Sequence, residues 1–226
     1  MITNSALHYQ IISTFVHCGH APSIDDLAVT FVVPPEAVRE ALVALQDYHG
    51  VVLHPVTNEL WAAHPFSTAP TSFWVASGAR GWWANCAWCA MGVVHLVGGT
   101  ASVTTTLGAE SKQVTIRVRD GVLQDEGLYV HFPVPMASAW DNVIYTCSTM
   151  LVFESAAQVS RWCERSRIPK GDLQPLGRVL EFARVWYGRH LQPDWTKWSA
   201  AEAAAIFDQF GLKGPIWEIE KAQRRF

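Results

Sequence analysis

The chain has 226 residues, of which half are hydrophobic and 16% are charged. This balance is typical of a folded protein with a packed core, and it excludes an intrinsically disordered chain. The 17 Lys and Arg residues stand against 20 Asp and Glu, so the formal net charge is −3, which excludes a generally basic nucleic-acid-binding protein. The length allows one large domain or two smaller ones, and the pattern along the chain favours two.

The sequence gives no sign of export or membrane insertion. No apolar run approaches the ~18 residues needed to cross a bilayer, and the first residues lack a basic segment followed by an apolar one. We therefore expect a cytoplasmic location and no membrane partner. The five cysteines are an odd number, which favours free thiols acting as nucleophiles or metal ligands over a disulfide framework. They are Cys18, Cys86, Cys89, Cys147 and Cys163.

Residues 1–63 predict a small helical module. Apolar residues recur at helical spacing over 7–16, Ser23 and Asp26 are spaced as a helix cap, and a third helix is predicted to begin near Pro34. Two short strands should follow near 51–53 and 60–61. This order is typical of a winged helix-turn-helix.

The third predicted helix is poorly suited to bind DNA. It carries Arg39 as its cation, beside Glu36, Glu40 and Asp47. These acidic side chains repel phosphate. We therefore expect no DNA partner, and a structural or dimerising role is favoured.

Residues 64–226 predict a second, α+β domain with a mostly antiparallel sheet and flanking helices. Thr- and Val-rich segments alternate in polarity and are joined by turn residues, as in a hairpin. The predicted strands span 102–107, 113–119, 128–134 and 142–153, and the predicted helices span 155–165, 174–190 and 199–210.

Two closely spaced cysteines, Cys86 and Cys89, lie just before an apolar run at residues 93–97. Asn85 is a good N-cap, which would place Cys86 in the first turn of a helix. The helix dipole and unpaired N–H groups should lower the pKa of Cys86 there. Cys89 follows at i+3, so both sulfurs can face one side and bind a soft metal.

A single CxxC pair leaves several roles open. It serves as a redox pair, as half of a zinc site, or as two small buried residues. The sequence has no second CxxC or HxxxH, which disfavours structural zinc, and no βαβ setting, which disfavours a thioredoxin-like role.

Several segments together resemble the alkylmercury (organomercurial) lyase family, over about residues 5–165. They are HPFSTAPT at 64–71, WANCAW at 83–88, the Thr/Ser-rich hairpin, YTCS at 145–148 and FES at 153–155. The resemblance implies that Cys86 matches the family's first mercury-binding cysteine. Cys147 matches the second, on a later strand. Cys89 falls where the family usually has an aspartate that helps to protonate carbon.

The resemblance implies protonolysis of a carbon–mercury bond, giving a hydrocarbon and Hg(II) as bound product, with no organic cofactor. In this interpretation Cys86 is the first nucleophile and ligand, Cys147 is the second ligand and proton source, and Cys89 is a third ligand or proton shuttle. Trp83 and Trp88 would line the substrate pocket, unless they serve only as core packing. The family expectation for a partner is a mercuric reductase.

Three other functions remain open. A third thiolate at Cys89 either preserves proton delivery or traps the metal, so the protein is alternatively a non-catalytic thiolate protein that sequesters Hg(II) or Cu(I). A family relative that cleaves another carbon–heteroatom bond is a further alternative. A transcriptional regulator is the weakest, because it rests on the N-terminal module alone.

Overall fold

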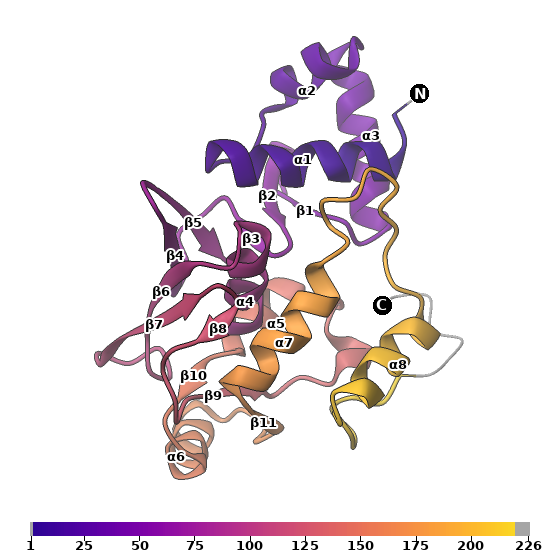
Figure 1. Cartoon of the computed structure of the whole chain (residues 1–226). Helices are drawn as coiled ribbons and strands as arrows, with labels where there is room; N and C mark the ends of the chain where they lie inside the picture. The colour runs from indigo at the N-terminus through magenta and orange to yellow at the C-terminus, as the bar shows by residue number, and fades with distance from the viewer. Residues whose placement is uncertain (1, 220–226) are drawn as a thin grey trace.

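The computed structural model describes residues 2–219, which contain eight α-helices, one short 3₁₀ helix and eleven strands (Figure 1). The helices are α1 (Asn4–Cys18), α2 (Ile24–Phe31), α3 (Pro35–Asp47), α4 (Ala87–Leu96), η1 (Met136–Ser138), α5 (Val143–Thr149), α6 (Ala156–Ser166), α7 (Leu176–Tyr187) and α8 (Ala200–Gln209). The strands are β1 (Val52–Leu53), β2 (Leu60–Ala63), β3 (Phe66–Ser67), β4 (Phe73–Ser77), β5 (Arg80–Ala84), β6 (Ala101–Thr106), β7 (Gln113–Arg119), β8 (Val122–Leu123), β9 (Tyr129–Phe132), β10 (Val152–Phe153) and β11 (Asp172–Pro175).

The strands form two antiparallel sheets. The larger has eight strands in the order β1-β2-β3-β5-β4-β6-β7-β8, and the smaller has the order β10-β9-β11. The predicted hairpin corresponds to β6 and β7, in which Val103 pairs with Ile116 and every second side chain of β6 is buried. The α+β class with a mostly antiparallel sheet is confirmed. Within the described residues, no helix has both the length and the hydropathy of a membrane span.

The three N-terminal helices and the β1–β2 hairpin join the rest of the molecule directly. Strand β2 pairs with β3, so the hairpin continues into the large sheet. The ring of Phe15 stacks on Phe66 with centroids 4.9 Å apart, and Trp82 Nε1 donates to the Phe15 carbonyl at 2.6 Å. Helix α1 therefore shares its core with the strands that lead to α4.

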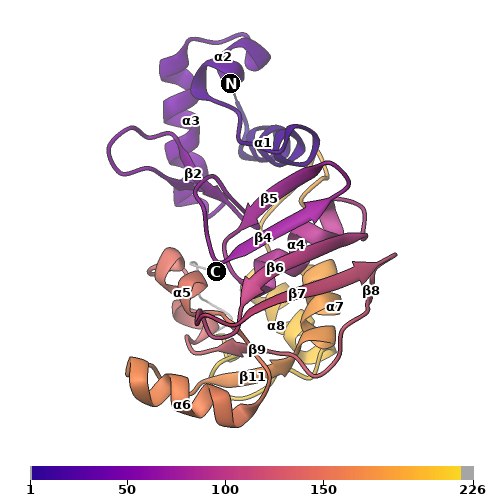
Figure 2. The same cartoon turned by 90° about the vertical axis from the view of Figure 1, so that its left-hand side faces the viewer.

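Helix α4 lies at the centre of the molecule. It packs on β4 and β5 on one side and on α7 on the other, and all but one of its residues are buried. Figure 2 shows the strands of the large sheet on the near side, with α4 and α7 behind them. A helix covered on all sides is apolar all round, which explains the continuous hydrophobic run after the CxxC pair.

The predicted strand over 142–153 is wrong for most of its length. The segment forms α5 and then only the short strand β10. The side chain of Asn142 caps α5 by accepting from Tyr145 N at 3.0 Å, and Thr149 Oγ1 donates back to the Thr146 carbonyl at 2.9 Å. These local bonds satisfy the backbone of a short helix and override the strand preference of its β-branched residues.

Candidate active site

Cys86, and not Asn85, caps helix α4. Cys86 Sγ accepts a hydrogen bond from Cys89 N at 3.3 Å. The Asn85 side chain instead donates to the carbonyls of Pro65 at 3.2 Å and Phe66 at 2.8 Å. The predicted helix is confirmed, but its start is one residue later, because Asn85 is used to fix the segment before β3.

The fold brings Cys86, Cys89 and Cys147 to one buried cavity. Cys147 lies on α5, and the expected later strand is therefore replaced by a helix at this position. The segment after α5 is tied to the start of α4, since Ala87 N donates to the Met150 carbonyl at 3.1 Å. All three cysteines are buried, and they line a cavity of about 80 Å³. Residues distant in sequence thus place three thiols together.

His64 is a fourth polar member of this cluster. Its Nε2 lies 3.6 Å from Cys147 Sγ, and the donor atoms of His64, Cys89 and Cys147 all lie within 4.8 Å of one another. Burial lowers the pKa of His64, against the opposing charge of Cys89. The sequence interpretation did not single out His64, although it begins the HPFSTAPT segment.

Tyr187, at the end of α7, also contacts the cluster. Its hydroxyl lies 3.4 Å from Cys89 Sγ. The ring passes over α4 at Gly92, where a Cβ atom would lie 2.3 Å from Tyr187 Cδ2. Because glycine has no Cβ atom, the tyrosine ring can pack this close to the helix backbone. Sequence reasoning missed Tyr187, because no motif marks a tyrosine whose role depends on helix packing.

The thiols differ sharply in acidity. Burial opposes ionisation of Cys89, but hydrogen bonds from Cys147 and Cys86, the nearby His64 ring and the Tyr187 hydroxyl lower its pKa well below the ordinary value. Burial raises the pKa of Cys86, and hydrogen bonds to the other two thiols raise that of Cys147. The expectation of a lowered pKa at Cys86 is therefore wrong, since desolvation outweighs the helix N-terminus. Cys89 is therefore the most acidic of the three thiols, and proton donors surround it.

The cavity has aromatic walls. Trp88 belongs to them, and its ring stacks on Phe182 with centroids 4.6 Å apart. His190 also lines the cavity and is buried. The other tryptophans in the lining are Trp140, Trp186, Trp195 and Trp198.

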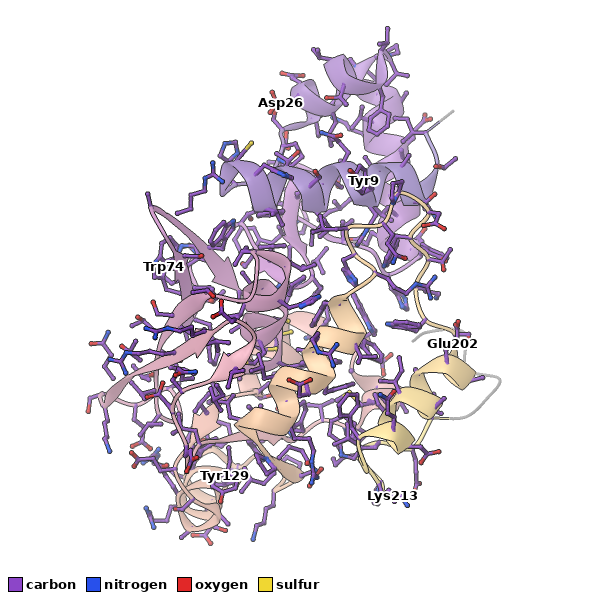
Figure 3. The ribbon with its side chains drawn as sticks, in the orientation of Figure 1. Tyr9, Asp26, Trp74, Tyr129, Glu202 and Lys213 are labelled. Atoms are coloured by element: carbon purple, nitrogen blue, oxygen red, sulfur yellow. The ribbon has the colours of Figure 1, made fainter. Side chains whose placement is uncertain are left out.

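Trp83 does not line this cavity. It lies on β5 between Trp82 and Ala84, whose side chains are buried on the face of the sheet that α4 covers. The alternation of a strand therefore sends Trp83 to the opposite face. There its ring packs against Trp74, with the ring centroids 4.7 Å apart; Trp74 is labelled in Figure 3. The expected pocket role of Trp83 is corrected to packing on the outer face.

No carboxylate replaces the family aspartate in the cavity. Among the described residues that line it, none is Asp or Glu, and Lys197 is the one Lys or Arg. The two remaining cysteines lie elsewhere. Cys18 is exposed at the end of α1. Cys163 lies on α6, and its Sγ is 3.7 Å from Nε2 of His131 on β9 of the smaller sheet. The proton donors next to the sulfurs are therefore thiols, the Tyr187 phenol and the His64 imidazole, not carboxylic acids.

A buried cavity lined by three thiols, the pKa of one of which is lowered, is a site for a thiophilic metal or its organic compounds. The family model of alkylmercury lyase, MerB, matches residues 66–188, which is more than half of the chain. The chain belongs to the alkylmercury lyase family.

The fold is similar to that of a solved structure. A crystal structure of the mercury-bound form of MerB2 matches with a TM-score of 0.66 and 18% sequence identity, over 81% of this chain and 91% of that chain. No curated protein sequence matches the chain significantly. Cys86, Cys89, Cys147 and Tyr187 lie inside the range of the family model, and His64 lies just before it.

Proposed function

We propose that the protein cleaves the carbon–mercury bond of organomercurials by protonolysis, giving a hydrocarbon and Hg(II). The observation that carries this proposal is the convergence of Cys86, Cys89 and Cys147 in one buried, aromatic-walled cavity, in a chain of the alkylmercury lyase family. Two of these cysteines match the positions of the family's mercury-binding pair. The roles of the individual thiols follow from their surroundings.

Cys89 makes the first attack on mercury. Its pKa is lowered well below the ordinary value, which favours the thiolate, and the thiolate is the form that binds soft metals. The sulfur of Cys89 forms a bond to mercury, and the halide or thiolate carried by the substrate leaves with the bonding electrons. This assignment exchanges the expected roles of Cys86 and Cys89, because Cys86 is the less acidic thiol.

Cys147 then supplies the proton. Its raised pKa keeps it protonated until mercury arrives. As its sulfur binds mercury, its proton passes to the carbon, and the electrons of the carbon–mercury bond form the new C–H bond. The products are R–H and Hg(II) held by the sulfurs of Cys89 and Cys147, with Cys86 available as a third ligand.

The cavity walls favour this chemistry over hydrolysis. Trp88 and the other tryptophans exclude bulk water, so charge developing on carbon is met by the thiol proton rather than by solvent.

A second function is favoured by one departure from the family pattern. Cys89 provides sulfur where the family usually has a carboxylate, and three sulfurs hold Hg(II) more tightly than two sulfurs and an oxygen. This change supports a protein that cleaves once and then retains the metal. Sequestration of Hg(II) without turnover is the alternative function.

One assay separates the two functions. The purified full-length protein is incubated with excess phenylmercury and excess thiol, and the benzene released per protein molecule is quantified. Many equivalents of benzene support an enzyme, whereas at most one equivalent with retained mercury supports a trap. Cys89→Ser removes the attacking thiolate and Cys147→Ser removes the proton source, so both should lose benzene release, and Cys163→Ser, outside the cavity, is the matched control.

A further inference from the structure

Four metal-binding side chains line the resting cavity. Cys86, Cys89 and Cys147 supply sulfur, and His64 supplies Nε2. They come from three separate parts of the chain: the segment after β2, the start of α4 and α5. Three thiols and one imidazole are a ligand set found in structural zinc sites.

The spacing of the donor atoms fits a tetrahedral ion. A zinc ion about 2.3 Å from a thiolate sulfur and about 2.0 Å from an imidazole nitrogen holds those two atoms about 3.5 Å apart at the tetrahedral angle. The distance from Cys147 Sγ to His64 Nε2 is 3.6 Å. The donor atoms of Cys89, Cys147 and His64 lie within 4.8 Å of one another, so small rotations of the side chains complete the site.

The surroundings favour a bound cation. All four side chains are buried, with exposed fractions between 0% and 8%. Three thiols so close together in a reduced state are prone to oxidation, and a metal ion protects them by occupying the sulfur lone pairs. Zinc suits a site that mixes sulfur with one nitrogen and has four donors, and it introduces no redox chemistry.

We propose that in the absence of mercury this protein binds one zinc ion through Cys86, Cys89, Cys147 and His64. The thiols that are protonated release their protons to solvent as zinc binds. An organomercurial or Hg(II) then displaces the zinc, because mercury is the softer ion and binds thiolates more strongly. Zinc binding goes beyond the lyase reaction and is tested without any mercury compound.

The test uses the reduced full-length protein with zinc alone. Zinc affinity is measured by competition with a chromophoric chelator, and bound zinc per protein by elemental analysis. Cobalt(II) is used as a spectroscopic probe, since thiolate coordination gives a charge-transfer band and tetrahedral geometry gives intense visible bands. We expect one tightly bound zinc per chain, tetrahedral cobalt spectra with sulfur charge transfer, and a thermal unfolding midpoint raised by zinc.

Variants identify the ligands. His64→Asn should lower zinc affinity by about 100-fold, and Cys147→Ser should lower it at least as much. Cys163→Ser should leave it unchanged, although Cys163 lies at a similar distance, 3.7 Å, from His131 Nε2. Circular dichroism of each variant without metal establishes that it is folded.

The outcomes are decisive in both directions. The site is supported if one zinc binds per chain, if His64→Asn or Cys147→Ser lowers the zinc affinity, and if Cys163→Ser leaves the zinc affinity unchanged. Zinc that does not bind, zinc whose affinity neither site variant changes, or binding of copper(I) alone would overturn it. The lyase proposal is judged separately by benzene release, so a protein that binds zinc and releases no benzene rejects the lyase and retains the zinc site.

Discussion

The imidazole of His64 touches the thiol of Cys147, with Nε2 to Sγ at 3.6 Å, although 83 residues separate them in the chain. The contact joins the segment after β2 to helix α5. It also selects one orientation of the Cys147 side chain, the thiol assigned as the proton source.

His64→Ala removes this contact. We expect the rate of benzene release to fall by about 10-fold or more, because a misplaced proton donor is costly to a reaction of fixed geometry. The number of mercury atoms bound per protein should stay the same, since all three thiols remain. A loss of mercury binding without a slower cleavage step would contradict the positioning role.

Cys89→Asp restores the residue type usual for the family. The attacking thiolate is lost, so we expect a slower cleavage step; oxygen also holds Hg(II) less tightly than sulfur, so we expect less retained mercury in the presence of excess thiol. Steady-state benzene release and retained mercury measure the two effects. Unchanged values for both would remove the chemical role assigned to Cys89.

Tyr187→Phe deletes the hydroxyl that lies 3.4 Å from Cys89 Sγ. This contact lowers the pKa of Cys89, so its loss should raise that pKa. Activity depends on the thiolate and falls as the pH drops through the pKa of Cys89. The acidic limb of the pH profile should therefore move to higher pH in the variant. Tyr9→Phe, on α1, is the control. Identical pH profiles for the wild type and Tyr187→Phe would show that the Tyr187 hydroxyl does not lower the pKa of Cys89.

Trp88→Leu and Trp83→Leu form a matched pair. Trp88 lines the cavity and Trp83 does not, so only the first substitution should change the KM for an organomercurial, by several-fold. The comparison uses initial rates over a range of substrate concentrations. An equal effect of both substitutions on the KM would contradict the assignment of Trp88, and not Trp83, to the lining of the substrate cavity.

The sequence predicted the elements whose signals are local. The hairpin of β6 and β7 follows from alternating polarity, and the helix predicted over 199–210 corresponds to α8, which begins with a capping box of Ser199 and Glu202. The positions of Cys86 and Cys89 at the start of a helix were also close to correct. These features depend on residues within a few positions of one another.

Features that depend on tertiary packing were missed. The β-branched run around Cys147 favoured a strand, but Asn142 and backbone-directed hydroxyls make it a helix. The contacts of His64 and Tyr187 with the thiols join parts of the chain 83 and 98 residues apart. Spacing rules for zinc ligands, which compare nearby residues, could not detect such a set.

Buried histidines should make the protein sensitive to mild acid. Burial, followed by the neighbouring His64, lowers the pKa of His190 from 6.5 to about 3, and burial also lowers that of His8 well below its ordinary value. Below pH 6.5 the unfolded chain binds protons that the folded chain does not. The free energy of unfolding should therefore fall as the pH drops from about 6.5 towards 3, by at most about 1.4 kcal/mol per pH unit for each histidine.

His8→Phe isolates one of these contributions. His8 is stacked on Trp195, with centroids 3.5 Å apart, and neither ring nitrogen has a hydrogen-bond partner among the described residues. Phenylalanine keeps the stacking and removes the protonation. Urea unfolding at pH 7 and pH 5 should show a smaller loss of stability in the variant than in the wild type. An equal loss in both would exclude His8 as a source of the acid sensitivity.

The most direct measurement is mercury X-ray absorption on protein that has reacted with one equivalent of an organomercurial. We expect the mercury spectrum to change from a metal bonded to carbon to one bonded to two or more sulfurs with no carbon, and we expect Cys147→Ser to retain the bond to carbon. Mercury that keeps its carbon in the wild-type protein, or that binds a single sulfur, would contradict the claim that these distant thiols act together on one atom.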